Sequence, residues 1–258
     1  MVQASVVKGT CNCRRKGKKM KRSFVFILVL MTAVGLTIQC GGGGGGGGMS
    51  VAKLEGTWFG VVRDNVENAH TMEMTIDASG IISDIYLDAK LMIGLSGTVA
   101  NDSGNIFGFV MSDGLEGGFM ADDSATHMGY LDEDFLVGVL QKGASNVPSY
   151  AGTDFQGTWS GYSIWLDADL EIVESGSTNM TIDATYDAVG TVLIGTFDGY
   201  IAGWSPPWGI AWGWDDTETY YFEVLMSTDK QFVATWSCED VVETWYVEDC
   251  EFGVWSKQ

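Results

Sequence analysis

The 258-residue sequence has little proline, little histidine and, after its first 40 residues, few basic side chains. It contains 3 prolines and 2 histidines, and eight of its 14 Lys and Arg residues lie before residue 41. The remaining 6 face all 34 Asp and Glu residues, so the chain after residue 40 carries a formal charge of about −28. Such a body repels phosphate backbones, which excludes nucleic acid as a partner.

The sequence also lacks the short motifs of common enzyme and metal sites. It has no P-loop and no G-x-S-x-G turn, and His70 and His127 do not have zinc-ligand spacing. We therefore predict a non-enzymatic protein with no catalytic residue, no metal site and no cofactor. Acidic pairs in predicted turns, such as Asp122-Asp123 and Asp215-Asp216, leave two interpretations open, calcium ligands or solvated turns.

The amino-terminal part has a sequence pattern of its own. A basic segment from Lys18 to Arg22 precedes 15 uncharged residues, Phe24 to Ile38, and Cys40 and eight glycines follow. The apolar run is shorter than the roughly twenty residues of a membrane-spanning helix, and the pattern is typical of a secretory signal peptide. Together with Cys40, it resembles the precursor of a bacterial lipoprotein.

This resemblance implies that Cys40 is lipidated and becomes the mature amino terminus. Residues 1–39 would then be leader and signal peptide, and residues 40–50 a lipidated cysteine with a flexible glycine-rich tether. Gly41 occupies the position at which such precursors carry an aspartate when they stay at the inner membrane. The expected location is the bacterial cell envelope, anchored to the outer membrane, with the membrane as a partner through the lipid.

The body contains an internal repeat. Leu54 to Trp58 recurs as Phe155 to Trp159, and the Met-Thr-Ile-Asp-Ala of residues 74–78 recurs at residues 180–184. A third match relates residues 138–142 to residues 253–257. Three matches in the same order indicate a duplication, with copies over residues 51–145 and 146–258.

Each copy has the apolar period of two that is typical of strands. Met72, Met74 and Ile76 alternate with polar residues, and short turn segments rich in Gly, Asp and Asn separate such runs. The sequence therefore predicts an all-β fold in which two tandem, homologous antiparallel meanders close as barrels or sandwiches. Whether the two copies share one core stays open.

Gly-Thr-Trp, which opens each copy, resembles the start of the calycin barrels, a group that includes lipocalins, fatty-acid-binding proteins and avidins. The resemblance implies that Trp58 and Trp159 plug the closed end of each barrel.

The segment W-S-P-P-W-G-I-A-W-G-W, residues 204–214, is the most aromatic part of the chain. Aligned at an offset of 105, Trp212 and Trp214 match Phe107 and Phe109, which predicts that they are core residues. For Trp204 and Trp208 two interpretations remain, an aromatic lip for a ligand or rings folded over the barrel end. These four tryptophans, Trp204, Trp208, Trp212 and Trp214, are the candidate ligand-binding residues.

Cys238 and Cys250 are the cysteines that remain after the leader and Cys40. They flank one predicted hairpin in an oxidising compartment, so we expect them to form a disulfide.

These features favour a lipid-anchored envelope protein that binds a small molecule, glycan or protein through its barrel ends or loops. The alternatives are a purely structural or adhesive surface module, and a polysaccharide hydrolase that uses loop carboxylates. A cavity favours the first, filled barrels the second, and a groove with two facing carboxylates the third.

Overall fold

The computed structural model describes residues 49–258, except residues 66, 168–170, 194, 218–219 and 240–249. The predicted signal peptide, Cys40 and all eight glycines of the tether lie outside the described residues. Among the residues that the structure describes, no helix has the length and apolar character needed to cross a membrane.

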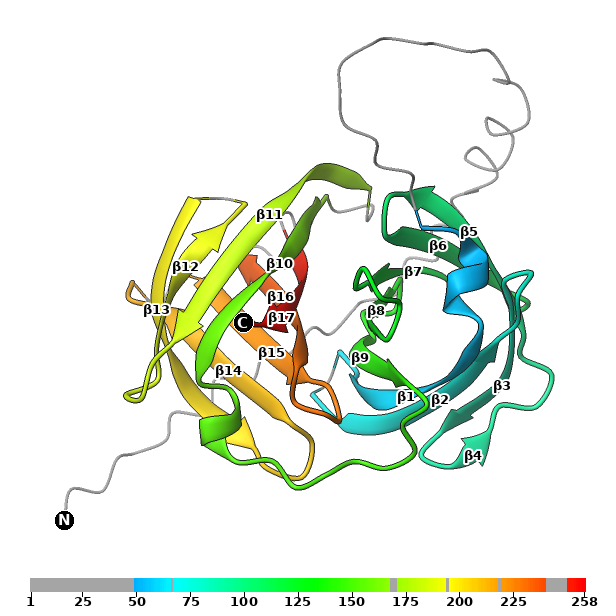
Figure 1. Ribbon diagram of the computed structural model, residues 1–258, viewed down its shortest axis with the longest axis horizontal. Helices are drawn as coiled ribbons and strands as arrows, with labels where there is room; N and C mark the ends of the chain where they lie inside the picture. The colour runs from blue at the N-terminus through cyan, green and yellow to red at the C-terminus, as the bar shows by residue number, and fades with distance from the viewer. Residues whose placement is uncertain (1–48, 66, 168–170, 194, 218–219, 240–249) are drawn as a thin grey trace, which may run out of the picture. The chain divides into compact units, whose positions relative to one another are not determined.

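Most of the described chain is folded into antiparallel strands that form two closed eight-stranded barrels (Figure 1). This confirms the predicted all-β class and the tandem architecture, and it decides for barrels over sandwiches. The two barrels belong to one compact unit, residues 48–258.

The first barrel closes where β1 pairs with β9, in the order β1-β2-β3-β5-β6-β7-β8-β9 around the wall, with β4 as a short addition beside β3. A four-residue 3₁₀ helix, η1 (Val51–Leu54), precedes it. Its strands are β1 (Gly56–Arg63), β2 (Ala69–Ile76), β3 (Ile81–Leu87), β4 (Lys90–Leu91), β5 (Gly97–Ser103), β6 (Ile106–Met111), β7 (Glu116–Ala121), β8 (His127–Asp132) and β9 (Val137–Lys142).

The second barrel closes where β10 pairs with β17, and its eight strands follow one another around the wall in sequence order. The short 3₁₀ helix η2 (Gly152–Asp154) precedes it. Its strands are β10 (Gly157–Leu166), β11 (Ile172–Ile182), β12 (Asp187–Val192), β13 (Gly195–Ser205), β14 (Ile210–Asp215), β15 (Tyr220–Met226), β16 (Phe232–Glu239) and β17 (Cys250–Lys257).

The internal repeat corresponds to the same strand pairings in both barrels. Trp58 lies opposite Met74 between the first two strands, and Trp159 lies opposite Met180 in the second barrel. The first and last strands also pair in the same register in both barrels. Lys142 is the partner of Trp58, and Lys257 is the partner of Trp159. The sequence matches therefore indicate a true structural duplication.

A buried tryptophan closes one end of each barrel. The indole nitrogens of Trp58 and Trp159 donate to the backbone carbonyls of Leu54 and Phe155, at 2.7 and 3.0 Å. Both indoles are fully buried, and each hydrogen bond ties the 3₁₀-helix segment to the first strand. A buried tryptophan thus stands at the same place in both barrels, and the calycin resemblance itself stays a prediction.

A lysine from the last strand covers each plug. Lys142 Nζ lies 5.0 Å from the ring centre of Trp58, and Lys257 Nζ lies 5.1 Å from that of Trp159. Each ammonium also donates to a backbone carbonyl in or beside the preceding 3₁₀ helix, at 2.6 and 3.0 Å. The cation–π contact and the hydrogen bond fix the closed end in the same way twice.

Three apolar clusters stabilise the described chain. One fills the first barrel, a second fills most of the second barrel, and the third lies between them. The two copies therefore have separate cores and also share a third cluster. From the first barrel this shared cluster takes Val61, Met120, Leu131, Val137 and Val139, and from the second Ile164, Leu166, Ile210, Leu225, Phe232, Ala234, Trp236, Cys250, Phe252 and Val254.

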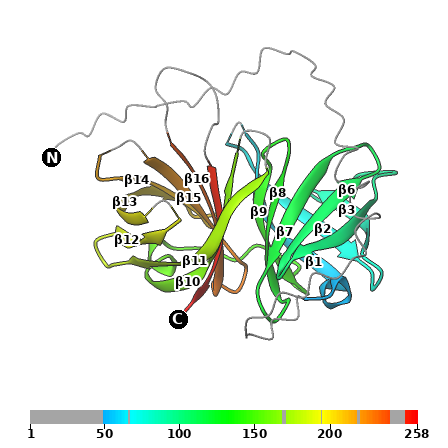
Figure 2. The same cartoon turned by 90° about the horizontal axis from the view of Figure 1, so that it is seen from above.

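Figures 1 and 2 show β8 and β9 of the first barrel beside β16 and β17 of the second. The two walls approach closely at Gly129 on β8. A Cβ atom placed there would lie 2.6 Å from side-chain carbons of Phe252 and Val254. Only glycine allows the two walls to come this near.

Candidate ligand-binding cavity in the second barrel

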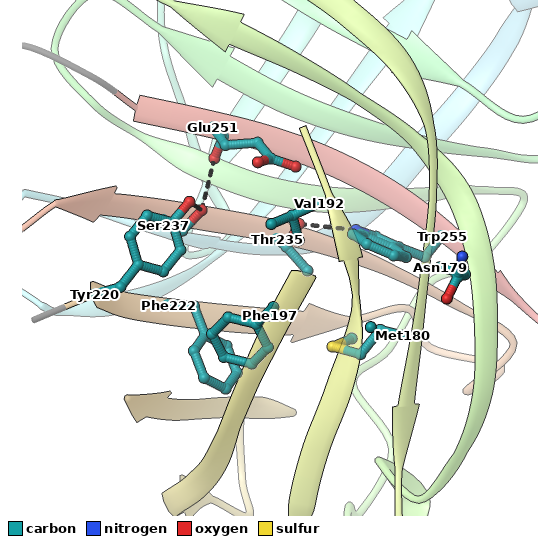
Figure 3. Close-up of a pocket in the computed structure, with 11 residues that line it drawn as sticks. Asn179, Met180, Val192, Phe197, Tyr220, Phe222, Thr235, Ser237, Glu251 and Trp255 are labelled. Atoms are coloured by element: carbon teal, nitrogen blue, oxygen red, sulfur yellow. Dashed lines mark hydrogen bonds between the residues drawn. The ribbon is translucent and has the colours of Figure 1, made fainter. Parts of the chain in front are cut away.

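An internal cavity of about 30 Å³ lies in the second barrel (Figure 3). A water molecule needs roughly 10–15 Å³ of such space, so the cavity holds a small chemical group. Its walls combine aromatic, aliphatic and polar residues. The lining consists of Asn179, Met180, Gly190, Val192, Phe197, Tyr220, Phe222, Thr235, Ser237, Glu251 and Trp255.

The inward residues of β14 and of the matching strand β6 differ in size. On β14, Ala211 belongs to the core of the second barrel, and the ring of Phe222 occupies the space beside Gly213, where a Cβ atom would meet it at 2.5 Å. In the first barrel, β6 places Phe107 and Phe109 on its inner face, where both are buried. The matching strands thus carry small inward residues in one barrel and large rings in the other.

The prediction that Trp212 and Trp214 are core residues is wrong. Both are half-buried on the outer face of β14. Trp212 lies across Gly203 of the neighbouring strand, and the ring of Trp214 meets that of Tyr221 edge-on, with centroids 5.0 Å apart. The alignment of the two copies at an offset of 105 was wrong by one residue. In a strand, a shift of one residue moves a side chain to the opposite face.

Trp204 and Trp208 pack in different surroundings. Trp204 lies near the end of β13 with 37% of its surface exposed, stacks on Tyr186 with ring centres 5.0 Å apart, and lies against Gly152 of η2. Trp208 is half-buried and packs against the apolar cluster between the barrels. None of the four candidate tryptophans lines the cavity.

The polar end of the cavity is built from side chains of β15, β16 and β17. The Tyr220 and Ser237 hydroxyl oxygens lie 2.7 Å apart, and the Trp255 indole nitrogen donates to the Thr235 hydroxyl at 2.8 Å. Glu251 is the charged member of this group and is only 2% exposed.

Glu251 is held by a neighbour from β10 and by one that follows β12. One carboxylate oxygen accepts the Leu193 backbone N–H at 3.2 Å. Burial raises the pKa of Glu251 above its usual range, although a hydrogen bond from Ser163 acts in the opposite direction. Glu251 was not among the candidate residues predicted from the sequence. The signal that would have found it is the period of two, because Trp255, four residues later on the same strand, also points inward.

A larger hollow of about 280 Å³ lies where the connection between the barrels passes the β15–β16 turn. Its walls are almost entirely polar, with Gln141, Lys142, Thr228 and Asp229 among them. It lacks the apolar walls that bury a small ligand, so the smaller cavity is the stronger candidate site.

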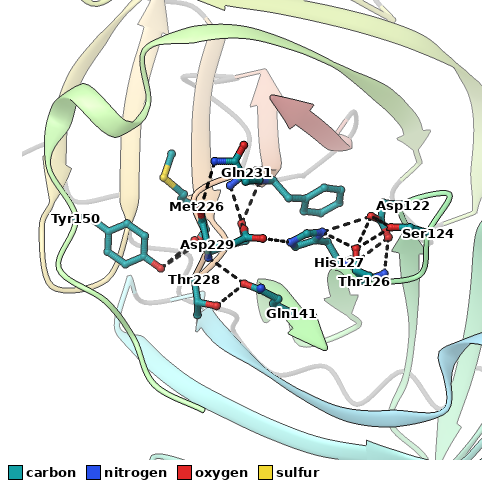
Figure 4. Close-up of polar contacts among 12 residues, drawn as sticks. Asp122, Ser124, Thr126, His127, Gln141, Tyr150, Met226, Thr228, Asp229 and Gln231 are labelled. Carbon is teal, nitrogen blue, oxygen red and sulfur yellow. Dashed lines mark hydrogen bonds and ion pairs between the residues drawn. The ribbon is translucent and has the colours of Figure 1, made fainter. Parts of the chain in front are cut away.

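His127 forms a bridge between the barrels beside this hollow (Figure 4). Its Nε2 lies 2.8 Å from a carboxylate oxygen of Asp229 in the second barrel, and its Nδ1 lies 3.4 Å from Asp122 in the first. Phe232 stacks on the imidazole, with ring centres 5.2 Å apart. The bridge thus joins β8 to the turn between β15 and β16.

Electrostatics favour the charged form of His127. Burial lowers its pKa, but the hydrogen bonds and charges of Asp122 and Asp229 outweigh burial, and the pKa is raised overall. The pKa values of both aspartates are lowered despite their partial burial. With both ring nitrogens facing carboxylates, the imidazolium has no free lone pair for a general base, and the arrangement acts as a clamp.

A buried ion pair adds a second link between the barrels. Arg63 Nε of β1 lies 3.0 Å from a carboxylate oxygen of Glu223 on β15, and the Tyr221 hydroxyl donates to the other oxygen at 2.5 Å. Glu223 is 3% exposed, and burial raises its pKa although Arg63 acts against this.

Several carboxylates in the acidic turns bind the backbone of their own turn. Asp122 accepts N–H groups of Thr126 and His127 at 2.7 and 3.0 Å, and Asp215 accepts that of Tyr220 at 2.8 Å. The Asp of the repeated Met-Thr-Ile-Asp-Ala does the same in both barrels. Among the residues with described positions, no three His, Cys, Asp or Glu side chains gather as metal ligands.

Cys238 and Cys250 are direct register partners between β16 and β17. This placement suits the predicted disulfide, which stays a prediction.

Comparison with known proteins identifies no family. No protein-family model matches the chain, and no curated protein sequence matches it. The chain is similar to a solved structure from Nostoc punctiforme, a protein with unknown function from the DUF3598 family. That similarity has 10% identity and a TM-score of 0.33, and it covers 81% of this chain and 99% of the other.

Proposed function

We propose that this protein is a lipid-anchored, non-enzymatic binding protein of the bacterial envelope, whose second barrel binds a small molecule. The observation that carries the proposal is the difference between the two interiors. Aromatic and aliphatic side chains form the core of the first barrel, whereas the cavity described above lies in the second and has aromatic walls with polar groups at one end. A mostly apolar cavity with a few directed polar groups is the usual form of a small-molecule site.

The closed end of each barrel supports the finer part of the proposal, a calycin-like binding barrel. Trp58 and Trp159 seal the end at which each barrel begins. A ligand would therefore enter the second barrel from the opposite end. Glu251 lies towards that end, because it comes six residues before Lys257, which covers Trp159.

The experiment that tests binding is native mass spectrometry of the protein purified from cells. We expect a co-purified small molecule that is lost in a Val192→Phe variant, because Val192 lines the cavity and a phenyl ring would fill it. Val189→Phe is the matched control, since Val189 lies on the same strand and is 44% exposed. A wild-type protein that never carries or binds a small molecule would contradict the proposal.

The proposed anchor rests on the sequence of residues 18–48, and it has its own test. Cells given labelled palmitate should incorporate the label into the wild-type chain and not into a Cys40→Ser variant. Fractionation should place the labelled protein in the outer membrane. Equal labelling of the two chains would contradict lipidation at Cys40.

A purely structural or adhesive module is the second candidate function. It is favoured by the filled first barrel and by the apolar cluster that joins the two barrels. On this alternative the second cavity holds only water. The Val192→Phe variant would then gain stability and lose no ligand.

The hydrolase alternative has weaker support. Carboxylates in several acidic turns accept hydrogen bonds from their own backbone, and His127 is held between two aspartates. These carboxylates are committed to turn structure, so the proposed role remains binding without catalysis.

A further inference from the structure

Glu251 contributes a carboxylate to the lining of the cavity. Residues 143–258 contain two basic side chains, Lys230 and Lys257, and no arginine or histidine. Within the described part of the chain, no ion pair involves Glu251. A buried carboxylate without a counter-ion is costly, so its presence in the wall of a cavity requires an explanation.

Both lysines of the second barrel are held at its closed end. Lys257 covers Trp159 and donates to the backbone carbonyl of Asp154 at 3.0 Å. Lys230 lies 2.8 Å from the carboxylate of Asp154. Neither ammonium is available to Glu251, because each already has a partner beside η2.

Aromatic rings surround the same cavity. Phe197 and Phe222 meet edge-on with ring centres 4.8 Å apart, and Tyr220 and Trp255 complete the aromatic part of the lining (Figure 3). The faces of aromatic rings attract cations, and this attraction is stronger where water is excluded. A buried carboxylate beside several aromatic rings is a chemical environment suited to an ammonium group.

The position that corresponds to Glu251 in the first barrel carries no charge. The last strands align from Gly138 with Gly253 to Lys142 with Lys257, as their register with the first strands shows. Continuing this alignment pairs Glu251 with Leu136, which packs against the core of the first barrel. At this position of the last strand, the carboxylate thus occurs in the barrel that has the cavity and not in the other.

We propose that the second barrel binds the protonated amine head group of a small ligand, with Glu251 as its counter-ion. This inference rests on the proposed function, since it names the ligand class of the same cavity. The cavity volume of about 30 Å³ suits a head group of the size of an ammonium, while the rest of the ligand extends beyond it. Carboxylate ligands are disfavoured by the charge of Glu251, to which Glu174 adds a second negative charge nearby.

Three probes of equal chain length test this inference by isothermal titration calorimetry on the full-length protein at neutral pH. They are n-butylammonium, 1-butanol and butyrate, which have four carbons each and differ in charge. We expect n-butylammonium to bind best and butyrate worst. Replacing Glu251 in a Glu251→Gln variant should weaken n-butylammonium binding about tenfold or more, because a charge-assisted hydrogen bond is lost.

Two further variants keep the test decisive. Glu171→Gln removes an exposed carboxylate of the same barrel and should leave binding unchanged. Val192→Phe should abolish binding of every probe by filling the cavity, and near-UV circular dichroism establishes that each variant is folded.

Binding of 1-butanol as strong as that of n-butylammonium, and equal in the Glu251→Gln variant, would overturn the amine inference and leave the cavity as a ligand site. If none of the probes binds the wild-type protein, both the inference and the proposed function are overturned. Loss of n-butylammonium binding in the Glu251→Gln variant, with unchanged binding in the Glu171→Gln control, supports both the inference and the proposed function.

Discussion

In the first barrel, the rings of Phe109, Phe119 and Tyr130 meet one another with centroids 4.8 to 5.8 Å apart. In the second barrel, Phe197 and Phe222 meet edge-on and leave a cavity beside Glu251. The closed ends of the two barrels, by contrast, are built alike from tryptophan, lysine and a 3₁₀ helix. The strands and the plug thus specify the barrel, while the choice of inward residues decides whether it is solid or hollow.

The largest expected effect concerns what the two barrels share. Trp58→Ala and Trp159→Ala should each lower the free energy of unfolding by about 3–5 kcal/mol, because each removes a fully buried indole and its hydrogen bond. Urea unfolding followed by circular dichroism measures the change. Trp214→Ala, which removes a half-buried ring on the outer wall, is the control and should cost much less. A small effect for one plug alone would break the equivalence of the two ends.

A second difference is that residues 49–145 contain no cysteine, whereas β16 and β17 place Cys238 opposite Cys250. If the two form a disulfide, Cys238→Ser or a reductant should lower the free energy of unfolding by about 3 kcal/mol, since the bond closes a short loop. Unfolding curves with and without reductant measure this. Labelling of Cys238 and Cys250 by a thiol reagent before reduction would contradict the pairing.

Leu136 and Glu251 occupy matching inner positions of the two barrels. Giving each barrel the residue of the other tests the difference between the two interiors. Leu136→Glu should destabilise the first barrel by about 1–3 kcal/mol, because it brings a carboxylate against an apolar core. Glu251→Leu should stabilise the second barrel by about 1 kcal/mol at neutral pH, since it removes a buried charge.

The pH dependence of this exchange has a definite sign. The pKa of Glu251 is raised in the folded protein, so its carboxylate lowers stability as the pH rises above the ordinary value of about 4.5. The advantage of Glu251→Leu should therefore vanish below that pH and grow above it. Unfolding measured from pH 4 to pH 8 tests this, and an advantage that falls with rising pH would contradict it.

The smallest expected effect concerns the clamp between the barrels. The pKa of His127 is raised in the folded state, so its contribution is complete below pH 6.5 and is lost as the pH rises through the higher folded value. The pKa values of Asp122 and Asp229 are lowered, so their contribution is complete above about pH 3.8 and is lost in acid. Stability from the clamp is therefore greatest between these limits.

His127→Gln should lower the free energy of unfolding by about 1 kcal/mol near pH 5.5 and by less at pH 8. His70→Gln is the matched control, because His70 also lies between two aspartates, Asp64 and Asp88, but both belong to the first barrel. Cleavage of the inter-barrel connection by a protease should increase only in the His127 variant. Equal proteolysis of the two variants would argue against a clamp.

The architecture was predictable from the sequence because its signals are local or repeated. The period of two gives the strands, and the matches around Trp58 and Trp159 mark paired strands that the structure contains twice. The failure at Trp212 and Trp214 has the same origin. No signal fixes the register within the aromatic segment, and an alignment error of one residue reverses the face of every side chain.

The cavity was not predictable to the same degree. Glu251 comes from β17, Leu193 lies beyond β12, and Ser163 belongs to β10, so the polar end of the cavity exists only after the barrel closes. The clamp is equally non-local, because His127 and Asp229 are separated by 102 residues. The four tryptophans were chosen because their segment is rich in aromatic residues. Such composition does not show which side chains line the same cavity.

The amino-acid sequence alone determined the all-β class, the duplication and the tryptophan at the start of each copy, since alternation and repetition are written along the chain. Tertiary structure alone decided that both copies close separately, that a third apolar cluster joins them, and that one interior is hollow. These properties depend on the summed volume and charge of inward side chains from eight strands. The inward side chains of eight strands meet only when those strands lie side by side in the folded barrel.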